Sequence, residues 1–164
     1  DLKDNGGVYL IPAFVGLSSP YWLPNTKAMY YGLTPSTNKN HIIRASLESI
    51  AYLIKDYLDI LNDNHNINPQ IINIDGGMSK NGFLIQLISN LTDKKINIPN
   101  MNDMSVYGSL MMGLLGTNNI NRLEDLYDIN INIQQFKPIE RDQSLINFKE
   151  WKKILEKYYL GHKN

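Results

Sequence analysis

The segment Asp75-Gly76-Gly77-Met78-Ser79-Lys80-Asn81 combines residue types that let a protein backbone approach a ligand closely. It follows an Ile-rich run that is typical of a strand, and it precedes an apolar periodicity that predicts a helix. Glycines remove the side chains that would obstruct a ligand, and the start of a helix presents N–H groups without intrahelical partners. A strand, a glycine turn and a helix start together suit the binding of a nucleotide.

Gly76, Gly77 and Asn81 are therefore the candidate ligand-binding residues, Asn81 because its amide could donate and accept from the first helical turn. A second interpretation is that the glycines form only a tight turn, with Ser79 capping the helix and Asn81 in solvent. The sequence contains neither GxxxxGK[ST] nor GxGxxG, so neither of these phosphate-binding motifs is present.

Other kinds of chemistry have less support in the sequence. His41, His65 and His162 lie far apart without HxxxH or HxxE spacing, and there is no Cys, so we predict neither a metal centre nor a thiol nucleophile. Glu48 and Asp56 lie on one predicted helix, where a solvent-exposed face is the expected location. No catalytic residue is assigned to the chain.

The composition predicts one folded domain and excludes several classes of partner. A chain of 164 residues with 43% hydrophobic residues could bury roughly 70% of its unfolded surface. Its 16 Lys and Arg balance 16 Asp and Glu, which leaves no net field to attract nucleic acid or an anionic membrane. No apolar run approaches the ~20 residues of a membrane span, and the absence of Cys favours a reducing compartment. We therefore expect a cytoplasmic protein.

Hydrophobic patterning predicts the elements that position the candidate site. Short strands are expected at residues 7–12 and 27–33, separated by an irregular loop at 14–25. A long helix should begin near Lys39, after a capping residue at position 36, 37 or 38. Its apolar stripe is Ile43, Leu47, Ile50, Ile54, Leu58 and Leu61.

The central part of the sequence alternates between strand and helix patterns. A buried strand is predicted at 71–75, a helix at 80–91 capped by Ser79, a strand at 95–99, and a helix through Leu115 that Ser105 caps and Gly116 ends. Alternation of this kind, with short connections, indicates an α/β layered sheet.

The C-terminal part is predicted to contain less regular structure. A small helical turn is expected at 122–127, and Asn/Ile-biased loops at 118–120 and 129–133. An amphipathic helix is predicted at 145–160, and its buried face carries four residues. These are Trp151, Ile154, Leu155 and Tyr158.

Several segments together resemble the FGGY carbohydrate kinases. The chain contains PAFVGLSSPYW and, later, DGGMSKN, and it matches a gapped pattern of that family's second domain. The matched positions are Ala28, Tyr30, Gly32 and Leu33, then, after seven residues, His41, Ile42, Ala45, Ser46, Leu47 and Glu48. The resemblance extends from Gly7 to about Lys153, and PAFxGLxxPYW favours the branch that phosphorylates glycerol over those that use xylulose or gluconate.

The resemblance implies an α/β fold, namely part of an actin-like (ribonuclease-H-like) ATPase domain in which helices flank a layered sheet. It implies ATP and Mg²⁺ as cofactors, and transfer of the γ-phosphoryl group to glycerol to give sn-glycerol 3-phosphate. In the family, the second glycine of DGG and the Asn four residues later contact adenosine. These positions are Gly77 and Asn81 in this sequence, and Gly76 belongs to the same turn.

The resemblance also implies that residues 1–164 form the C-terminal portion of the second domain. The N-terminal lobe that holds glycerol and the catalytic Asp, and the GTG phosphate hairpin, would lie upstream of Asp1. Because phosphoryl transfer depends on positioning and charge stabilisation, we expect this chain alone to be inactive, with Mg²⁺ held mainly by parts outside it. The complete protein is expected to bind ATP or ADP and glycerol and to form a homo-oligomer, without nucleic acid or membrane partners.

Two alternatives stay open: a kinase of the xylulose or gluconate type, and a non-catalytic, kinase-derived module that binds a nucleotide or a partner. The sequence departs from W-D-P-x-A-R-G in many relatives, with Leu23, Lys27 and Ala28 in place of Asp, Arg and Gly. Lys cannot reproduce a bidentate Arg contact, so we expect weaker contacts at this point. Ser109 and Leu110 are bulkier than the Ala pair of relatives and predict altered helix packing.

Overall fold

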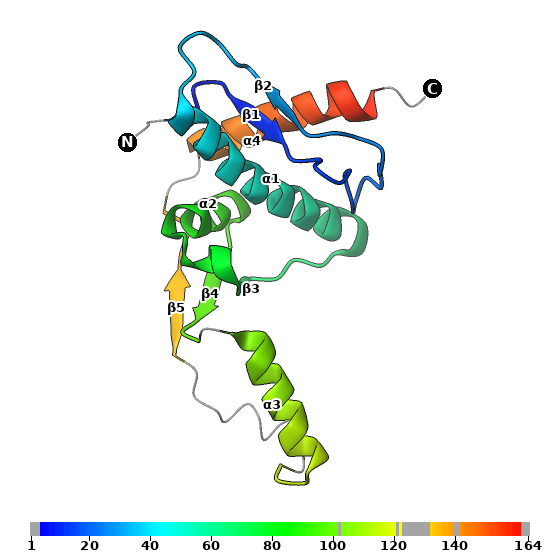
Figure 1. The fold of residues 1–164 in the computed structure, drawn as a ribbon, viewed down its shortest axis with the longest axis vertical. Helices are drawn as coiled ribbons and strands as arrows, with labels where there is room; N and C mark the ends of the chain where they lie inside the picture. Colours follow the sequence, from blue (N-terminus) through cyan, green and yellow to red (C-terminus); the bar gives the residue numbers. More distant parts are fainter. Residues whose placement is uncertain (1–3, 102, 121, 123–131, 140–141, 162–164) are drawn as a thin grey trace.

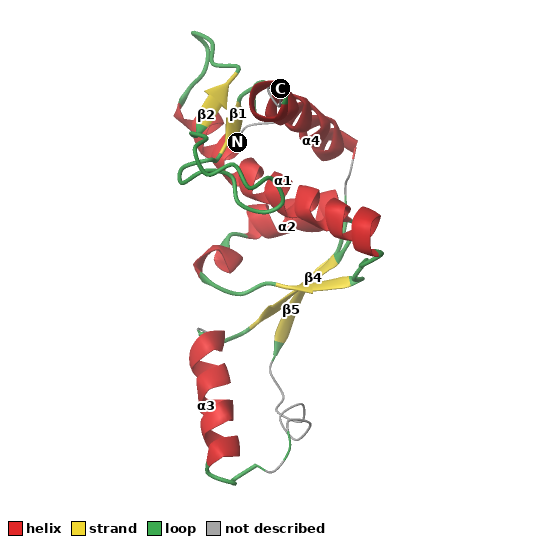
Figure 2. Ribbon diagram, turned by 90° about the vertical axis from the view of Figure 1, so that its right-hand side faces the viewer, coloured by secondary structure: helices red, strands yellow, loops and turns green. Residues whose placement is uncertain are grey.

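The computed structural model describes residues 4–101, 103–120, 122, 132–139 and 142–161. Helices α1 (Lys39–His65), α2 (Gly82–Thr92) and α4 (Asp142–Leu155) pack with a two-stranded sheet in the upper part of Figure 1. A three-stranded sheet lies below α2, and α3 (Met104–Gly116) extends away from the rest of the molecule, as both views show (Figures 1 and 2).

The two N-terminal strands are confirmed. β1 (Tyr9–Ile11) pairs antiparallel with β2 (Met29–Tyr31), and all three residues of β1 are buried. The indole Nε1 of Trp151 in α4 donates a hydrogen bond to the carbonyl of Leu10 at 2.8 Å. The first strand is therefore fixed to a helix from the other end of the sequence.

Helix α1 begins as predicted, but it buries a different face. Asn38 is the N-cap, and its side chain accepts from the backbone N–H groups of Asn40 and His41. The predicted apolar stripe is wrong at Ile43 and Ile50, which are 47% and 37% exposed. The buried face is displaced around the helix and contains polar residues; it consists of Ala45, Glu48, Ser49, Ala51, Tyr52 and Asp56.

The first buried carboxylate is Glu48, which is 2% exposed, so the expectation of an exposed face is wrong. Its oxygens accept from Arg44 Nε at 2.8 Å, from Asn5 Nδ2 at 3.0 Å and from the Tyr52 hydroxyl at 2.9 Å. A buried charge is tolerated only when it is paired and hydrogen-bonded, and these three donors meet that requirement.

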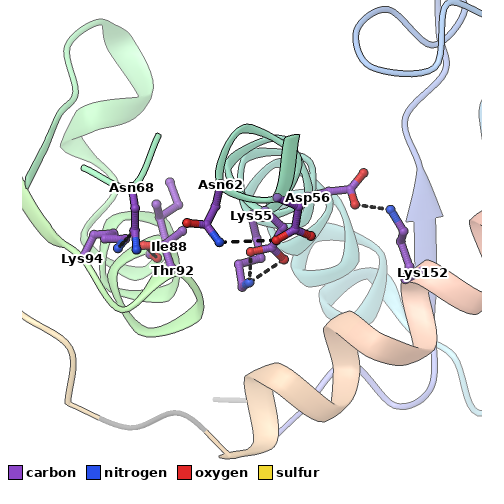
Figure 3. Close-up of polar contacts among 10 residues, drawn as sticks. Lys55, Asp56, Asn62, Asn68, Ile88, Thr92, Lys94 and Lys152 are labelled. Carbon is purple, nitrogen blue, oxygen red and sulfur yellow. Dashed lines mark hydrogen bonds and ion pairs between the residues drawn. The ribbon is translucent and has the colours of Figure 1, made fainter. Parts of the chain in front are cut away.

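The second buried carboxylate is Asp56, also 2% exposed and also expected in solvent. The Lys152 ammonium from α4 donates to it (Figure 3). The Tyr21 hydroxyl from the loop after β1 also donates to it. Lys152 Nζ also lies 2.7 Å from the Tyr21 oxygen. The cluster joins α1 to α4 and to the loop between the two strands.

The central sheet has the order β3-β4-β5. β3 (Ile71–Asn73) and β4 (Lys95–Pro99) are parallel and connected through α2, as the alternating pattern predicts, whereas β5 (Ile133–Phe136) is antiparallel to β4. The prediction of a buried strand at 71–75 is wrong in part. β3 is shorter, and Ile71 is 45% exposed because, among the described residues, the strand has a neighbour on one side only.

Strand β5 was not predicted, and its first residue, Ile133, lies in the loop that was expected at 129–133. Its sequence, Ile-Gln-Gln-Phe, lacks the apolar alternation of a strand with one buried face. The strand is stabilised instead by pairing with β4, including a hydrogen bond from Gln135 Nε2 to Asn97 Oδ1 at 2.8 Å. Because such cross-strand contacts join distant residues, local periodicity does not indicate them.

Helix α3 occurs where predicted, but its ends differ. Asp103, rather than Ser105, is the N-cap, and its carboxylate accepts from the backbone N–H groups of Ser105 and Val106. Gly116 lies inside the helix, and the left-handed residue after it is Asn118, with φ 57°. Asp can serve as an N-cap because its side chain accepts hydrogen bonds from nearby backbone N–H groups. Asn can follow the end of a helix because it adopts the left-handed region more readily than most residues.

The C-terminal helix is confirmed, with one correction at its end. Trp151, Ile154 and Leu155 of α4 are at most 4% exposed, whereas Tyr158 is 41% exposed and contacts the ring of Tyr31. Residues from Glu156 onward form a π-helical segment, η3 (Glu156–Leu160). The α-helical spacing of the buried residues therefore does not continue beyond Leu155. Of the predicted turn at 122–127, all but Arg122 lies outside the described residues.

The core lies between α1, α2 and α4, with β1 and β4 contributing from either end. Its largest fully buried side chains include Trp151, Tyr52, Ile88 and Leu155. Tyr52 lies 5.7 Å from Trp151 and 5.9 Å from Phe148, measured between ring centroids. Among the described residues, no helix is both long and apolar enough to cross a membrane.

The Asp56–Lys152 pair should contribute measurably to stability. Replacing Lys152 with Met leaves a buried carboxylate with only the Tyr21 donor. We expect the free energy of unfolding to fall by about 2 kcal/mol in urea denaturation, less than for a fully buried pair because Lys152 is 28% exposed. The control is Lys153→Met, which removes an exposed pair with Glu150 and should change stability by less than about 0.5 kcal/mol. Equal losses would contradict this account.

Alkaline pH should destabilise the fold through Tyr52. Burial, together with the charge of Glu48, raises the pKa of the Tyr52 hydroxyl above its ordinary value of 10.0. Above about pH 10 the unfolded chain releases this proton while the folded chain retains it, so stability is fully present below that pH and falls above it. The contribution of Tyr52 to the slope should approach about 1.4 kcal/mol per pH unit as the unfolded tyrosine becomes fully ionised. Denaturation between pH 9 and 11 should give a shallower slope for Tyr52→Phe, whereas identical slopes would contradict the assignment.

Candidate functional site

The candidate site begins where β3 ends. The N–H of Ile74 still donates to the carbonyl of Asn97 at 3.0 Å, so the chain stays against β4 for one residue more. At Gly76 the backbone turns sharply, with φ 96° and ψ 177°, a conformation that side chains disfavour. The short 3-10 helix η1 (Gly77–Lys80) follows and leads directly into α2.

Gly77 differs from Gly76 because nothing in the described chain requires a glycine there. Its φ does not lie in the left-handed region, and a Cβ built on it meets no atom within 4 Å. A Cβ on Gly76 also meets open space, and both residues are exposed. The turn therefore presents bare backbone outward, as a site for a closely bound ligand requires.

Asn81 connects this turn to α2. Its backbone has extended torsion angles, and its Oδ1 accepts from the N–H of Leu84 at 3.1 Å, which makes it the N-cap of α2. The expectation that Ser79 caps this helix is wrong, because Ser79 lies within η1 and its hydroxyl donates to the Gly76 carbonyl at 2.7 Å. The described residues offer no hydrogen-bond partner to Nδ2 of the half-buried Asn81.

Gly76, Gly77 and Asn81 therefore meet at one turn, and the fold fixes its geometry from both sides. Asn81 is held by α2, and Asp75 Oδ2 accepts from the backbone N–H of Met104, at the start of α3, at 3.3 Å. The turn lies at the carboxyl edge of the parallel pair β3 and β4, the edge where α/β sheets bind ligands.

A shallow hollow of about 400 Å³ lies beside the turn, and its volume falls within the range of small-molecule sites. It has apolar and amide side chains and one cation, Lys80. The lining residues are Ser79, Lys80, Ile98, Pro99, Asn100, Met101, Asn132, Ile133 and Gln134. The sequence did not predict this hollow, because Asn132, Ile133 and Gln134 lie at or beside β5, and that strand was not predicted.

The described residues contain no group of three or more His, Cys, Asp or Glu side chains that could hold a metal ion. His41 lies on the first turn of α1, where its Nδ1 accepts from the N–H of Asn38 at 3.1 Å. His65 is the last residue of α1, and His162 lies outside the described residues.

Comparison with known proteins agrees with this architecture. Residues 2–117 match the model of the FGGY family of carbohydrate kinases, C-terminal domain. The match covers most of the chain, so the chain belongs to this family. It includes β1, α1, the glycine turn, α2, β4 and α3.

Two curated relatives of the chain are glycerol kinases. The chain is 38% identical over 157 residues to a glycerol kinase of Clostridium perfringens and 34% identical over the same length to one of Citrobacter koseri. Each alignment covers 95% of this chain and 31% of the relative. The chain thus spans about a third of the length of the kinases it matches.

Solved structures support the same assignment. A glycerol kinase of Plasmodium falciparum, crystallised with ADP, matches 96% of this chain and 32% of its own with a TM-score of 0.81 and 27% identity. A xylulose kinase of Lactobacillus acidophilus matches with a TM-score of 0.76 at 19% identity, which supports the fold alone. The predicted α/β, actin-like fold class is confirmed.

Asn81 should stabilise the fold as the N-cap of α2, whether or not a ligand is bound. Asn81→Ala removes the acceptor for Leu84 N–H and should lower the free energy of unfolding by about 1 kcal/mol in urea denaturation. Asn81→Asp retains an acceptor at the same position and should change stability by only a few tenths of a kcal/mol. If Asn81→Asp were as destabilising as Asn81→Ala, the capping role would be wrong.

Proposed function

We propose that this chain supplies the adenosine-contacting part of an ATP-dependent kinase that phosphorylates glycerol. The observation that carries the proposal is the turn at Gly76 and Gly77, where bare backbone faces open space beside the unused amide donors of Asn81. The family assignment supports a nucleotide as the ligand, and the 38% identity to a glycerol kinase supports glycerol as the acceptor.

The residues present suit the nucleoside end of ATP. A ribose or a flat base can approach Gly77 because no Cβ lies in its path. Asn81 Nδ2 can donate to a ribose or base acceptor while Oδ1 remains bound to the helix. No described His, Cys, Asp or Glu cluster suits the metal of Mg-ATP. Parts of the kinase outside this segment would hold Mg²⁺, the γ-phosphate and glycerol.

In this proposal the chain contributes to catalysis by positioning. ATP bound at its adenosine end is fixed relative to the acceptor, and phosphoryl transfer depends mainly on such alignment and on charge stabilisation. The described residues supply binding energy and orientation, and we assign no proton transfer to them. Residues 1–164 would then be inactive alone, and self-association of a complete kinase stays a prediction.

The test is steady-state kinetics of a complete kinase that carries this segment. Gly77→Val should raise KM for ATP at least tenfold, about 1.4 kcal/mol, because the new side chain obstructs the adenosine contact. KM for glycerol should change less than twofold. The folded chain itself has space for the substitution, so loss of structure should not explain the effect.

The matched control is Gly82→Val, five residues along the chain, where a Cβ also meets no atom within 4 Å. It should leave both Michaelis constants within twofold of the parent values. Asn81→Asp gives a second readout, because it retains the helix cap but replaces the free NH₂ donor with an oxygen. It should weaken ATP binding while changing stability by only a few tenths of a kcal/mol. Equal effects of Gly77→Val and Gly82→Val on both substrates would contradict the proposal.

A further inference from the structure

The dipeptide Asn-Gly occurs twice in the sequence, at Asn5-Gly6 and at Asn81-Gly82. In this dipeptide the backbone nitrogen of the glycine can attack the side-chain amide carbon of the asparagine. Glycine favours the attack because it has no Cβ to obstruct its nitrogen and because it adopts a wide range of backbone conformations. Since both sites share this local chemistry, a difference in their reactivity must come from the fold.

The fold protects the first of the two sites. Asn5 is 3% exposed, its Nδ2 donates to Glu48 Oε2 at 3.0 Å, and its Oδ1 accepts from the N–H of Gly7 at 3.0 Å. The nitrogen that would attack, that of Gly6, donates to Asp4 Oδ1 at 2.9 Å. Both reacting groups are therefore bound, and releasing the Asn5 amide would deprive the buried Glu48 carboxylate of a donor.

The fold leaves the second site open to the same reaction. No described residue accepts from the N–H of Gly82, which is exposed, and none binds Nδ2 of Asn81. A Cβ built on Gly82 meets no atom within 4 Å, so the chain around this residue has room to move. Within the described chain, a single hydrogen bond holds the Asn81 side chain, namely the cap from Leu84 N–H at 3.1 Å.

The reaction requires this cap to open. With ψ of Asn81 at 94°, the Gly82 nitrogen lies opposite Cβ across the Cα–C bond, so the backbone must rotate before the nitrogen can reach Cγ. The rotation breaks the bond to Leu84 and unwinds the exposed start of α2. Openings at the end of a helix cost far less free energy than openings of a buried contact.

We propose that Asn81-Gly82 is a site of spontaneous deamidation, which removes the amide donors from the glycine turn. The Gly82 nitrogen loses its proton and forms a bond to Cγ of Asn81, while the side-chain NH₂ takes up a proton and leaves as ammonia. Water then opens the resulting succinimide at either of its two carbonyl groups, which gives aspartate or isoaspartate. Water is the only co-reactant, and one ammonia is released for each water consumed.

Both products alter the candidate site. Aspartate retains an oxygen that can accept from Leu84 N–H, so it still caps α2, but it has no amide hydrogen to donate. Isoaspartate also adds a methylene group to the backbone, which displaces the acceptor from its position at the cap. The consequence for ATP rests on the proposed function, whereas the modification itself does not.

The experiment incubates the 164-residue chain at about pH 8.5 and follows the peptides that contain Asn5 and Asn81 by mass spectrometry, which detects the exchange of NH₂ for OH. In the folded chain, deamidation at Asn81 should be at least tenfold faster than at Asn5. In guanidinium chloride the two rates should agree within about threefold, because unfolding removes the hydrogen bonds that protect Asn5.

Gly82→Ala tests the attack itself. The added methyl group obstructs the reacting nitrogen, and the folded chain has space for it, so the rate at Asn81 should fall at least fivefold without a loss of stability. The matched control is Gly108→Ala in α3, where a Cβ also meets no atom within 4 Å. It should leave the rate at Asn81 unchanged.

A ratio between the two sites below tenfold in the folded chain, or an unchanged rate in Gly82→Ala, would overturn the inference. A complete kinase that carries this segment gives a separate readout, because ADP bound to the Asn81 amide should slow deamidation there. If the ratio holds but ADP has no effect, the modification site stands and the proposed nucleotide contact fails. The two failures are therefore distinguishable.

Discussion

The structure depends on two carboxylates that α1 holds in the interior. Glu48 and Asp56 are each 2% exposed. Glu48 accepts from two donors of the helix and from Asn5 outside it, whereas the donors to Asp56 come from other segments. Asp56 is bound by Lys152 from α4 (Figure 3) and by Tyr21 from the loop after β1. Satisfying this one charge therefore fixes three segments. Removing a donor leaves an uncompensated buried charge, which is costlier than losing an ordinary contact.

The candidate site depends on these two charges indirectly, through the packing of helices α1 and α2. Helix α1 packs on α2, and the first turn of α2 is fixed by Asn81, which ends the glycine turn. On the opposite side, Asp75 connects the turn to α3. Packing, capping and one side-chain to backbone bond therefore leave Gly76 and Gly77 little freedom, although both face open space.

Local sequence signals predicted most of this arrangement. β4 and the start of α1 were predictable because short apolar runs and capping residues act over a few positions. The burial of Glu48 and Asp56 was not, because it depends on donors that are distant in sequence: Asn5 lies 43 residues from Glu48, and Lys152 lies 96 residues from Asp56. The spacing of DGG and Asn81 identified candidate residues, but the role of Asn81 as the cap was missed because a 3-10 helix separates the strand from α2.

The central claim is that the turn at Gly77 receives the adenosine end of a nucleotide. The most direct measurement is a crystal structure of a complete kinase carrying this segment, determined with ADP. The account predicts that the adenosine lies in van der Waals contact with the Gly77 backbone and within hydrogen-bond distance of Asn81 Nδ2. An ordered ADP whose adenosine lies away from both residues would contradict it.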